Sequence, residues 1–152
     1  MKNDNNKILL VDNEADIALA FKIGLEDSGF TVDAFNDPLS ALESFKEEKK
    51  SYALALLDIN MPKMNGFELY KEIRKIDDKV KVCFVTAFDI QREEADDLKA
   101  VGTLNDEKPA IIRKPITIDD LVKRVNPELL ILAYIEIFLN KFLYYCNLYI
   151  LI

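Results

Sequence analysis

Short, nearly continuous apolar runs alternate along most of the chain with segments of helical spacing. The runs are KILLV at 7–11, TVDAF at 31–35, ALALL at 53–57, VCFV at 82–85 and AII at 110–112. Runs of this length are typical of strands buried on both faces of a sheet. Between them, apolar residues recur every three or four positions, as Ile17, Phe21 and Leu25 do, which indicates amphipathic helices. The alternation predicts a doubly wound α/β domain, in which helices cover both faces of a five-stranded parallel sheet.

The residues at the expected helix ends agree with this pattern. Asp37 followed by Pro38 is typical of a helix N-cap with proline at the first helical position. Gly29 stands where the first helix should stop. Thr117 and Asp120 resemble a capping box that opens a last helix.

Polar side chains follow four of the five runs. They are Asp12, Asn13, Glu14, Asp58, Asn60, Thr86 and Lys114. Because parallel strands end at the same edge of a sheet, where ligands of such folds bind, we expect these groups to meet. Carboxylate and carbonyl oxygens are the ligands that Mg2+ prefers, and an ammonium and a hydroxyl are suited to phosphoryl oxygens.

Four motifs in this order, LLVDNE at 9–14, LLDINMPKMNG at 56–66, VTA at 85–87 and RKP at 113–115, resemble those of response-regulator receiver domains. The resemblance covers roughly residues 7–125. It implies a flavodoxin-like fold with five helices and the strand order 2-1-3-4-5. It also implies a phosphorylation-dependent switch of a two-component system, which is not an enzyme beyond self-phosphorylation from small phosphodonors and autodephosphorylation.

The resemblance also implies a role for each polar residue. Asp58 is the expected phosphoacceptor, Thr86 and Lys114 are expected to bind the phosphoryl group, and Mg2+ is the expected cofactor. The expected metal ligands are Asp12, Asp58, Asn60 through its backbone carbonyl and, weakly, Asn13. The expected phosphoryl donor is a sensor histidine kinase or a histidine phosphotransfer protein, and the output is contact with a downstream protein that the sequence does not identify.

Three departures from the family pattern affect these expectations. Asn13 stands where a second acid is usual, which predicts weaker metal binding, and Glu14 could compensate through a water or simply favour the helix dipole. Ile111 stands where an aromatic switch residue is common, so output through that rotamer is not expected in its usual form. Residues 102–109 form a polar and somewhat long loop before the fifth run.

Composition narrows the classes of function. The 152 residues suffice for one domain with its own core. A net charge of -7 without a basic stripe argues against direct nucleic-acid binding. The chain has no histidine, so it contains no phosphohistidine and no histidine metal ligand. Cys83 and Cys146 lack CxxC spacing and the N-terminus does not resemble a signal peptide, which together predict a cytoplasmic protein.

Residues 129–152 form an almost wholly apolar tail, so we expect a receiver domain over 1–128 and a tail of open role beyond it. Membrane insertion is marginal, because the cost of Lys141 and Glu136 roughly cancels the gain from the apolar residues. A helix packed against a partner, with Glu136, Asn140 and Asn147 on its polar face, is a second interpretation. The third interpretation is a read-through or frameshifted end, because the tail consists mostly of Ile, Leu, Phe, Tyr, Asn and Lys, which AT-rich codons encode.

Two other functions compete with a phosphorylated receiver. A pseudo-receiver would use the fold as a protein-binding module without phosphorylation, which Asn13 and Ile111 favour. The joint retention of Asp58, Thr86 and Lys114 argues against it. A phosphohydrolase with an aspartate nucleophile would need a second acid close to Asp58, and the DINMP stretch lacks the DxD pattern of such enzymes.

Overall fold

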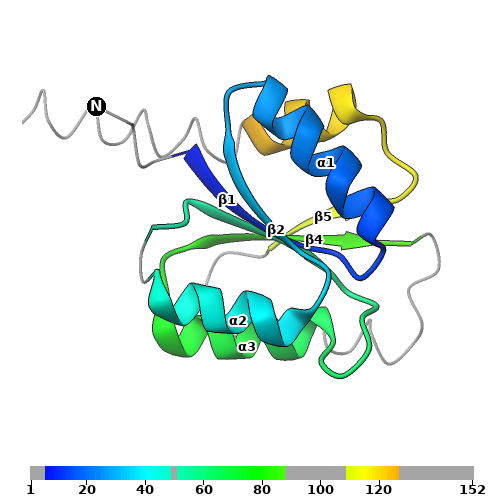
Figure 1. Cartoon of the computed structure of the whole chain (residues 1–152). Helices are drawn as coiled ribbons and strands as arrows, with labels where there is room; N and C mark the ends of the chain where they lie inside the picture. The colour runs from blue at the N-terminus through cyan, green and yellow to red at the C-terminus, as the bar shows by residue number, and fades with distance from the viewer. Residues whose placement is uncertain (1–5, 49–50, 88–108, 127–152) are drawn as a thin grey trace, which may run out of the picture.

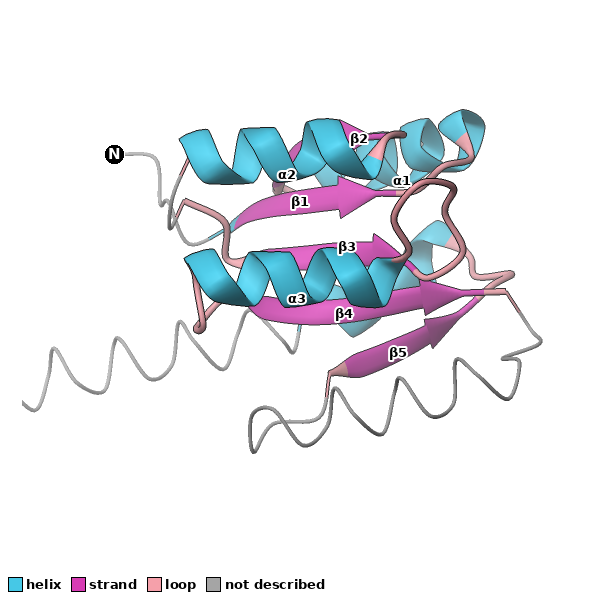
Figure 2. Ribbon diagram, turned by 90° about the horizontal axis from the view of Figure 1, so that it is seen from below, coloured by secondary structure: helices cyan, strands magenta, loops and turns pink. Residues whose placement is uncertain are grey.

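The computed structural model describes residues 6–48, 51–87 and 109–126. These residues form a parallel sheet of order β2-β1-β3-β4-β5. The strands are β1 (Lys7–Val11), β2 (Thr31–Phe35), β3 (Leu54–Asp58), β4 (Lys81–Thr86) and β5 (Ala110–Arg113). Figure 2 shows β1, β3, β4 and β5 running in the same direction, so that their carboxyl ends share one edge. The flavodoxin-like order 2-1-3-4-5 is therefore confirmed.

Helices cover both faces of the sheet, as expected. The named helices are α1 (Ala15–Asp27), α2 (Pro38–Glu47) and α3 (Gly66–Ile76), and residues 118–126 are also helical. Figure 1 shows α1 and the helical residues 118–126 on one face, with α2 and α3 on the other. The remaining expected helix, the fourth in chain order, falls between β4 and β5 on residues 88–108, outside the described residues. The tail 129–152 and the domain boundary at 128 also lie outside them.

Two apolar layers, one on each face of the sheet, explain why the strand runs are nearly continuous. Leu9 and Val11 belong to the layer under α2 and α3. Ile8 and Leu10, between them in sequence, belong to the layer under α1 and residues 118–126. Successive side chains of a strand point to opposite faces, so a strand covered on both faces needs apolar residues at every position.

The expected helix ends are largely confirmed. The Asp37 side chain accepts a hydrogen bond from the Ser40 N–H, with Pro38 at the start of α2. Gly29 has φ 95°, a left-handed conformation that glycine adopts without strain, directly after the C-cap of α1. Thr117 caps residues 118–126 by accepting from the Asp120 N–H, although the returning bond joins the Thr117 hydroxyl and the Asp120 carboxylate.

One capping feature and one strand boundary differ from the expectation. A full capping box opens α3, where Asn65 accepts from the Glu68 N–H and the Glu68 carboxylate accepts from the Asn65 N–H. The third strand covers 54–58 and not 53–57, because Asp58 pairs with Val85 of β4. Asp58 is thus the last residue of β3, held in the sheet, and not the first residue of a loop.

Candidate functional site

Four strands deliver polar side chains to the carboxyl edge of the sheet. Asp12 follows β1, and its N–H donates to the Phe35 carbonyl of β2 over 3.0 Å. Asp58 ends β3, and Thr86 ends β4. Lys114 follows β5, and its N–H donates to the Thr86 carbonyl over 2.7 Å. Backbone hydrogen bonds of the sheet therefore hold the main chain of these residues at the carboxyl ends of the strands. This confirms that the four residues converge on one edge.

The side chains of Asp12, Asp58 and Lys114 form a buried charged cluster. Lys114 Nζ lies 2.7 Å from Asp12 Oδ2 and 3.6 Å from Asp58 Oδ2. The exposed fractions of the two aspartate side chains are only 2% and 5%, against 12% for the lysine. A third carboxylate reaches the same ammonium from the rim, since Glu14 Oε1 lies 3.4 Å from Lys114 Nζ. Three carboxylates therefore surround one ammonium.

This crowding shifts the proton affinities of the site. Burial and, after it, the nearby Asp12 charge raise the pKa of Asp58, and the smaller opposing effect of the Lys114 charge leaves that pKa at about 6. Burial alone would lower the pKa of the Lys114 ammonium. The close ion pair with Asp12 and the negative charges of Asp58 and Glu14 outweigh burial, so the pKa of Lys114 is raised. The cluster thus has more carboxylates than ammonium groups at a site that is largely buried from solvent.

The other expected site residues lie around this cluster. Thr86 is fully buried at the end of the strand next to Asp58, and its hydroxyl donates to the Ala87 carbonyl over 3.1 Å. Asn60 is exposed, and its N–H donates to Asp58 Oδ1 over 3.4 Å. Asn13 is exposed directly after Asp12.

The donor set fits a hard divalent cation. Asp12 and Asp58 are buried carboxylates, and Asp12 Oδ2 is a buried oxygen that, apart from the Lys114 ion pair, accepts no hydrogen bond from the described residues. The described residues contain no group of three or more acidic, histidine or cysteine side chains that could hold a metal. Mg2+ commonly binds through one or two carboxylates and keeps several waters, so two carboxylates are adequate.

The loop after Asp58 is packed tightly against the end of β3. The Gly66 N–H donates to the Ile59 carbonyl over 2.9 Å. A Cβ atom at Gly66 would lie 2.4 Å from the Asp58 backbone oxygen, closer than real structures tolerate. The absence of a side chain at Gly66 therefore permits this close packing. Met61 belongs to the core layer under α2 and α3, and the partly buried Met64 packs against that layer.

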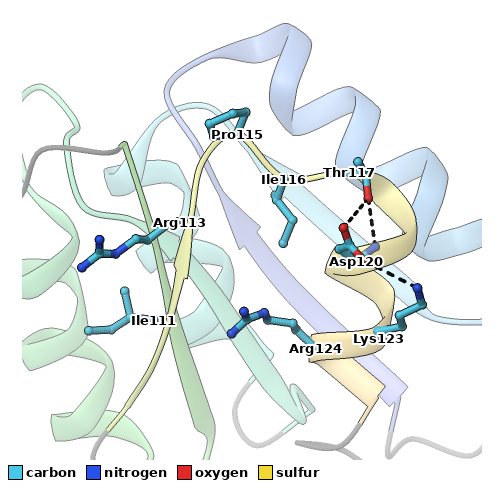
Figure 3. A pocket seen from close by; sticks show the side chains of 8 residues that line it. All are labelled: Ile111, Arg113, Pro115, Ile116, Thr117, Asp120, Lys123 and Arg124. Carbon is cyan, nitrogen blue, oxygen red and sulfur yellow. Dashed lines mark hydrogen bonds and ion pairs between the residues drawn. The ribbon is translucent and has the colours of Figure 1, made fainter.

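Two hollows adjoin this edge, and sequence reasoning predicted neither. One of about 480 Å³ is lined by Glu14, Ile17, Phe21, Ala87, Lys114, Pro115 and Ile116. The other, of about 810 Å³, lies between β5 and residues 118–126 (Figure 3). Its lining includes Ile111, Arg113 and Arg124, together with Lys123 and Asp120, which form an ion pair with each other. Ile111 is half-buried at the position where an aromatic residue is common in the family.

A parallel sheet of order 2-1-3-4-5 that carries two buried aspartates, a buried threonine and a lysine at its carboxyl edge defines a receiver-type signalling domain. The family model of the response regulator receiver domain matches residues 8–126. The chain belongs to this family, whose members are signalling domains of two-component systems and generally bind Mg2+ at their phosphorylation site.

Curated relatives fall into two kinds. The chain is 31% identical over 129 residues to the response regulator receiver protein CpdR of Brucella abortus, which covers 82% of this chain and 97% of that protein. It is 36% identical over 121 residues to the transcriptional regulatory protein CpxR homolog of Haemophilus influenzae. That match covers 80% of this chain and 49% of the relative, so the chain spans about half the length of such a transcriptional regulator.

Solved structures show the same fold. A response regulator receiver domain protein from Clostridium thermocellum superposes with a TM-score of 0.71 at 26% identity, covering 85% of this chain and 98% of that one. The chemotaxis protein CheY4 of Vibrio cholerae superposes with a TM-score of 0.67 at 26% identity, covering 80% and 96%. In the part of the chain that the structure describes, no helix is both long and apolar enough to span a bilayer.

Proposed function

We propose that Asp58 accepts a phosphoryl group and that the chain acts as a phosphorylation-controlled switch. The observation that carries this proposal is the cluster in which the Lys114 ammonium lies within 2.7 Å of Asp12 and 3.6 Å of Asp58, with both carboxylates buried. A buried carboxylate next to a second carboxylate and a lysine is costly to maintain, and such clusters concentrate at functional sites.

The chemistry follows from these positions. An Asp58 carboxylate oxygen attacks phosphorus in line, forming an O–P bond while the bond from phosphorus to the donor nitrogen breaks. Asp58 must be ionised to attack, and its pKa of about 6 leaves it mostly ionised at neutral pH. Lys114 is placed to contact the incoming phosphoryl oxygens, and the Thr86 hydroxyl lies at the adjacent strand end.

A metal ion would be held by Asp12, Asp58 and the backbone carbonyl of Asn60, with Asn13 as a weak further ligand. When bound, Mg2+ supplies positive charge that offsets the phosphoryl oxygens and the two carboxylates. The chain's own contribution is to hold Asp12 and Asp58 close together, and to supply one fixed cation in Lys114.

The donor must be another protein or a small phosphodonor, because the chain has no histidine. A sensor histidine kinase or a histidine phosphotransfer protein is the donor that we propose, with a downstream protein as target and the cytoplasm as location. Phosphorylation would change the local charge at the edge where Thr86 and Lys114 lie, and two-state receivers respond to such a change by a population shift.

Intact-mass measurement after incubation with acetyl phosphate and Mg2+ tests this proposal. We expect one added phosphoryl group in the wild type, labile in base as an acyl phosphate is, and none in Asp58→Ala. Asp77→Ala is a matched control, because Asp77 is also buried but lies at the C-cap of α3. Phosphate on Asp58→Ala contradicts the assignment to Asp58. A wild type that takes up none under any donor supports the pseudo-receiver alternative.

A further inference from the structure

Glu14 stands at the N-cap of α1 but does not cap the helix with its side chain. N-caps favour residues whose side-chain oxygen accepts from the first turn, and within the described residues the Glu14 side chain makes no such bond. Its carboxylate instead reaches Lys114, with Glu14 Oε1 3.4 Å from Lys114 Nζ. The Glu14 N–H donates to Asp12 Oδ1 over 3.0 Å, so backbone and side chain both engage the charged cluster.

The Lys114 ammonium sits off-centre among its three carboxylates. It is closest to Asp12 at 2.7 Å, next to Glu14 at 3.4 Å and farthest from Asp58 at 3.6 Å. The Asp12 contact is the shortest ion pair, and Lys114 also donates a long hydrogen bond to Glu14 Oε1 over 3.4 Å. The 3.6 Å to Asp58 Oδ2 exceeds the length of a charge-assisted hydrogen bond, so the ammonium only approaches Asp58. A phosphoryl group on Asp58 would require this ammonium to move toward that side of the site.

We propose that Glu14 is a positioning residue that holds the Lys114 ammonium on the Asp12 side of the site until phosphoryl oxygens draw it away. This inference rests on the proposed function of Asp58. Glu14 and the phosphoryl oxygens of a donor compete for the same ammonium. Because Lys114 would contact the donor in both the bound state and the transition state, removing the competition strengthens donor binding without changing the maximal rate.

A structure of Glu14→Gln determined without any donor tests the positioning directly. With the competing charge removed, Lys114 Nζ is expected to move to within hydrogen-bond distance of Asp58 Oδ2, from 3.6 Å to roughly 3 Å. An ammonium that keeps its wild-type position overturns the inference. This readout does not depend on phosphorylation, so it separates a failure of this inference from a failure of the proposed function.

Phosphorylation rates measured against acetyl phosphate concentration at saturating Mg2+ give the second test. Glu14 is largely exposed, so the expected effect of Glu14→Gln is modest, a fall in the KM for acetyl phosphate of about two- to fivefold with kcat unchanged. Asp16→Asn removes the same charge from the first turn of α1 and is expected to behave as the wild type. An equal fall in Asp16→Asn would show that net charge, and not Glu14, sets the KM.

Glu14→Asp separates contact from charge. It keeps the carboxylate but shortens the side chain by one methylene, which carries the oxygens out of reach of Lys114. We expect Glu14→Asp to share the lowered KM of Glu14→Gln. A wild-type KM in Glu14→Asp would show that only the field of the charge matters and would overturn the contact to Lys114 as the cause.

Discussion

Asp58 is expected to destabilise the folded domain at neutral pH, and its replacement by asparagine should reveal this. The pKa of its carboxyl is raised to about 6 from an ordinary 3.8, because of burial and the Asp12 charge. A carboxyl with a raised pKa favours the folded state only in its protonated form. The favourable contribution is present below the unfolded value of 3.8 and is lost as the pH rises through about 6.

The size of the effect follows from the shift. The rise in the pKa of Asp58 from 3.8 to about 6 lowers the free energy of unfolding by about 3 kcal/mol at pH values above both pKa values. Asparagine has nearly the same shape but carries no charge, so Asp58→Asn should be more stable than the wild type at neutral pH. The gain should be roughly 2 kcal/mol larger at about pH 7.5 than at about pH 4.5, where the carboxyl is already largely protonated in the folded state.

Urea unfolding at a series of pH values, with a chelator present to remove Mg2+, measures this difference. Asp33→Asn provides a control of opposite sign. Burial alone would raise the pKa of Asp33, but hydrogen bonds from Lys7 and Tyr52 outweigh it and lower the pKa. Its stabilising contribution is present above the ordinary pKa and is lost as the pH falls. An Asp58→Asn gain that does not change with pH would refute the reasoning, because it would show that packing and not charge is responsible.

Four further predictions concern other parts of the chain. Gly66→Ala should lower the free energy of unfolding by about 1–3 kcal/mol, measured by urea unfolding, and impair phosphorylation, because its Cβ would lie 2.4 Å from the Asp58 carbonyl oxygen. Tyr70→Phe should leave thermal stability unchanged or raise it by about 1 kcal/mol, since its buried hydroxyl has no partner among the described residues. Asn13→Asp should tighten Mg2+ binding severalfold by titration calorimetry; unchanged binding would place Asn13 away from the metal. Deletion after Glu128 should leave a cooperatively folding, phosphorylatable domain by calorimetry and intact mass.

The fold was predictable because its two strongest signals are local. Runs of about five apolar residues, separated by segments of helical spacing, admit few arrangements other than a parallel sheet covered on both faces. The observed layers follow that logic, with Leu9 and Leu10 buried on opposite faces of β1. Boundaries were predictable where a side chain bonds to a nearby backbone group, as Asp37 does at the start of α2.

The convergence of site residues was also predictable, because the ends of parallel strands share an edge whatever the loops do. The order of distances within the site was not. Nothing in the motifs indicates that Lys114 lies nearer to Asp12 than to Asp58, since this depends on the rotamers of buried side chains and on the balance of three negative charges. The Tyr70 hydroxyl, which has no hydrogen-bond partner among the described residues, is a similar case, because its surroundings come from separate elements.

Glu14 shows most clearly where local interpretation stops. From sequence, an acidic residue at the start of a helix is adequately explained by the helix dipole, and a water-mediated approach to a metal was the alternative. The structure shows a contact with Lys114, 100 residues away, and the carboxylate makes no bond that caps its own helix within the described residues. Glu14 therefore makes a long-range contact in place of the local cap that an N-cap side chain commonly supplies. Such an exchange is expected where a side chain serves the site more than it serves its own element.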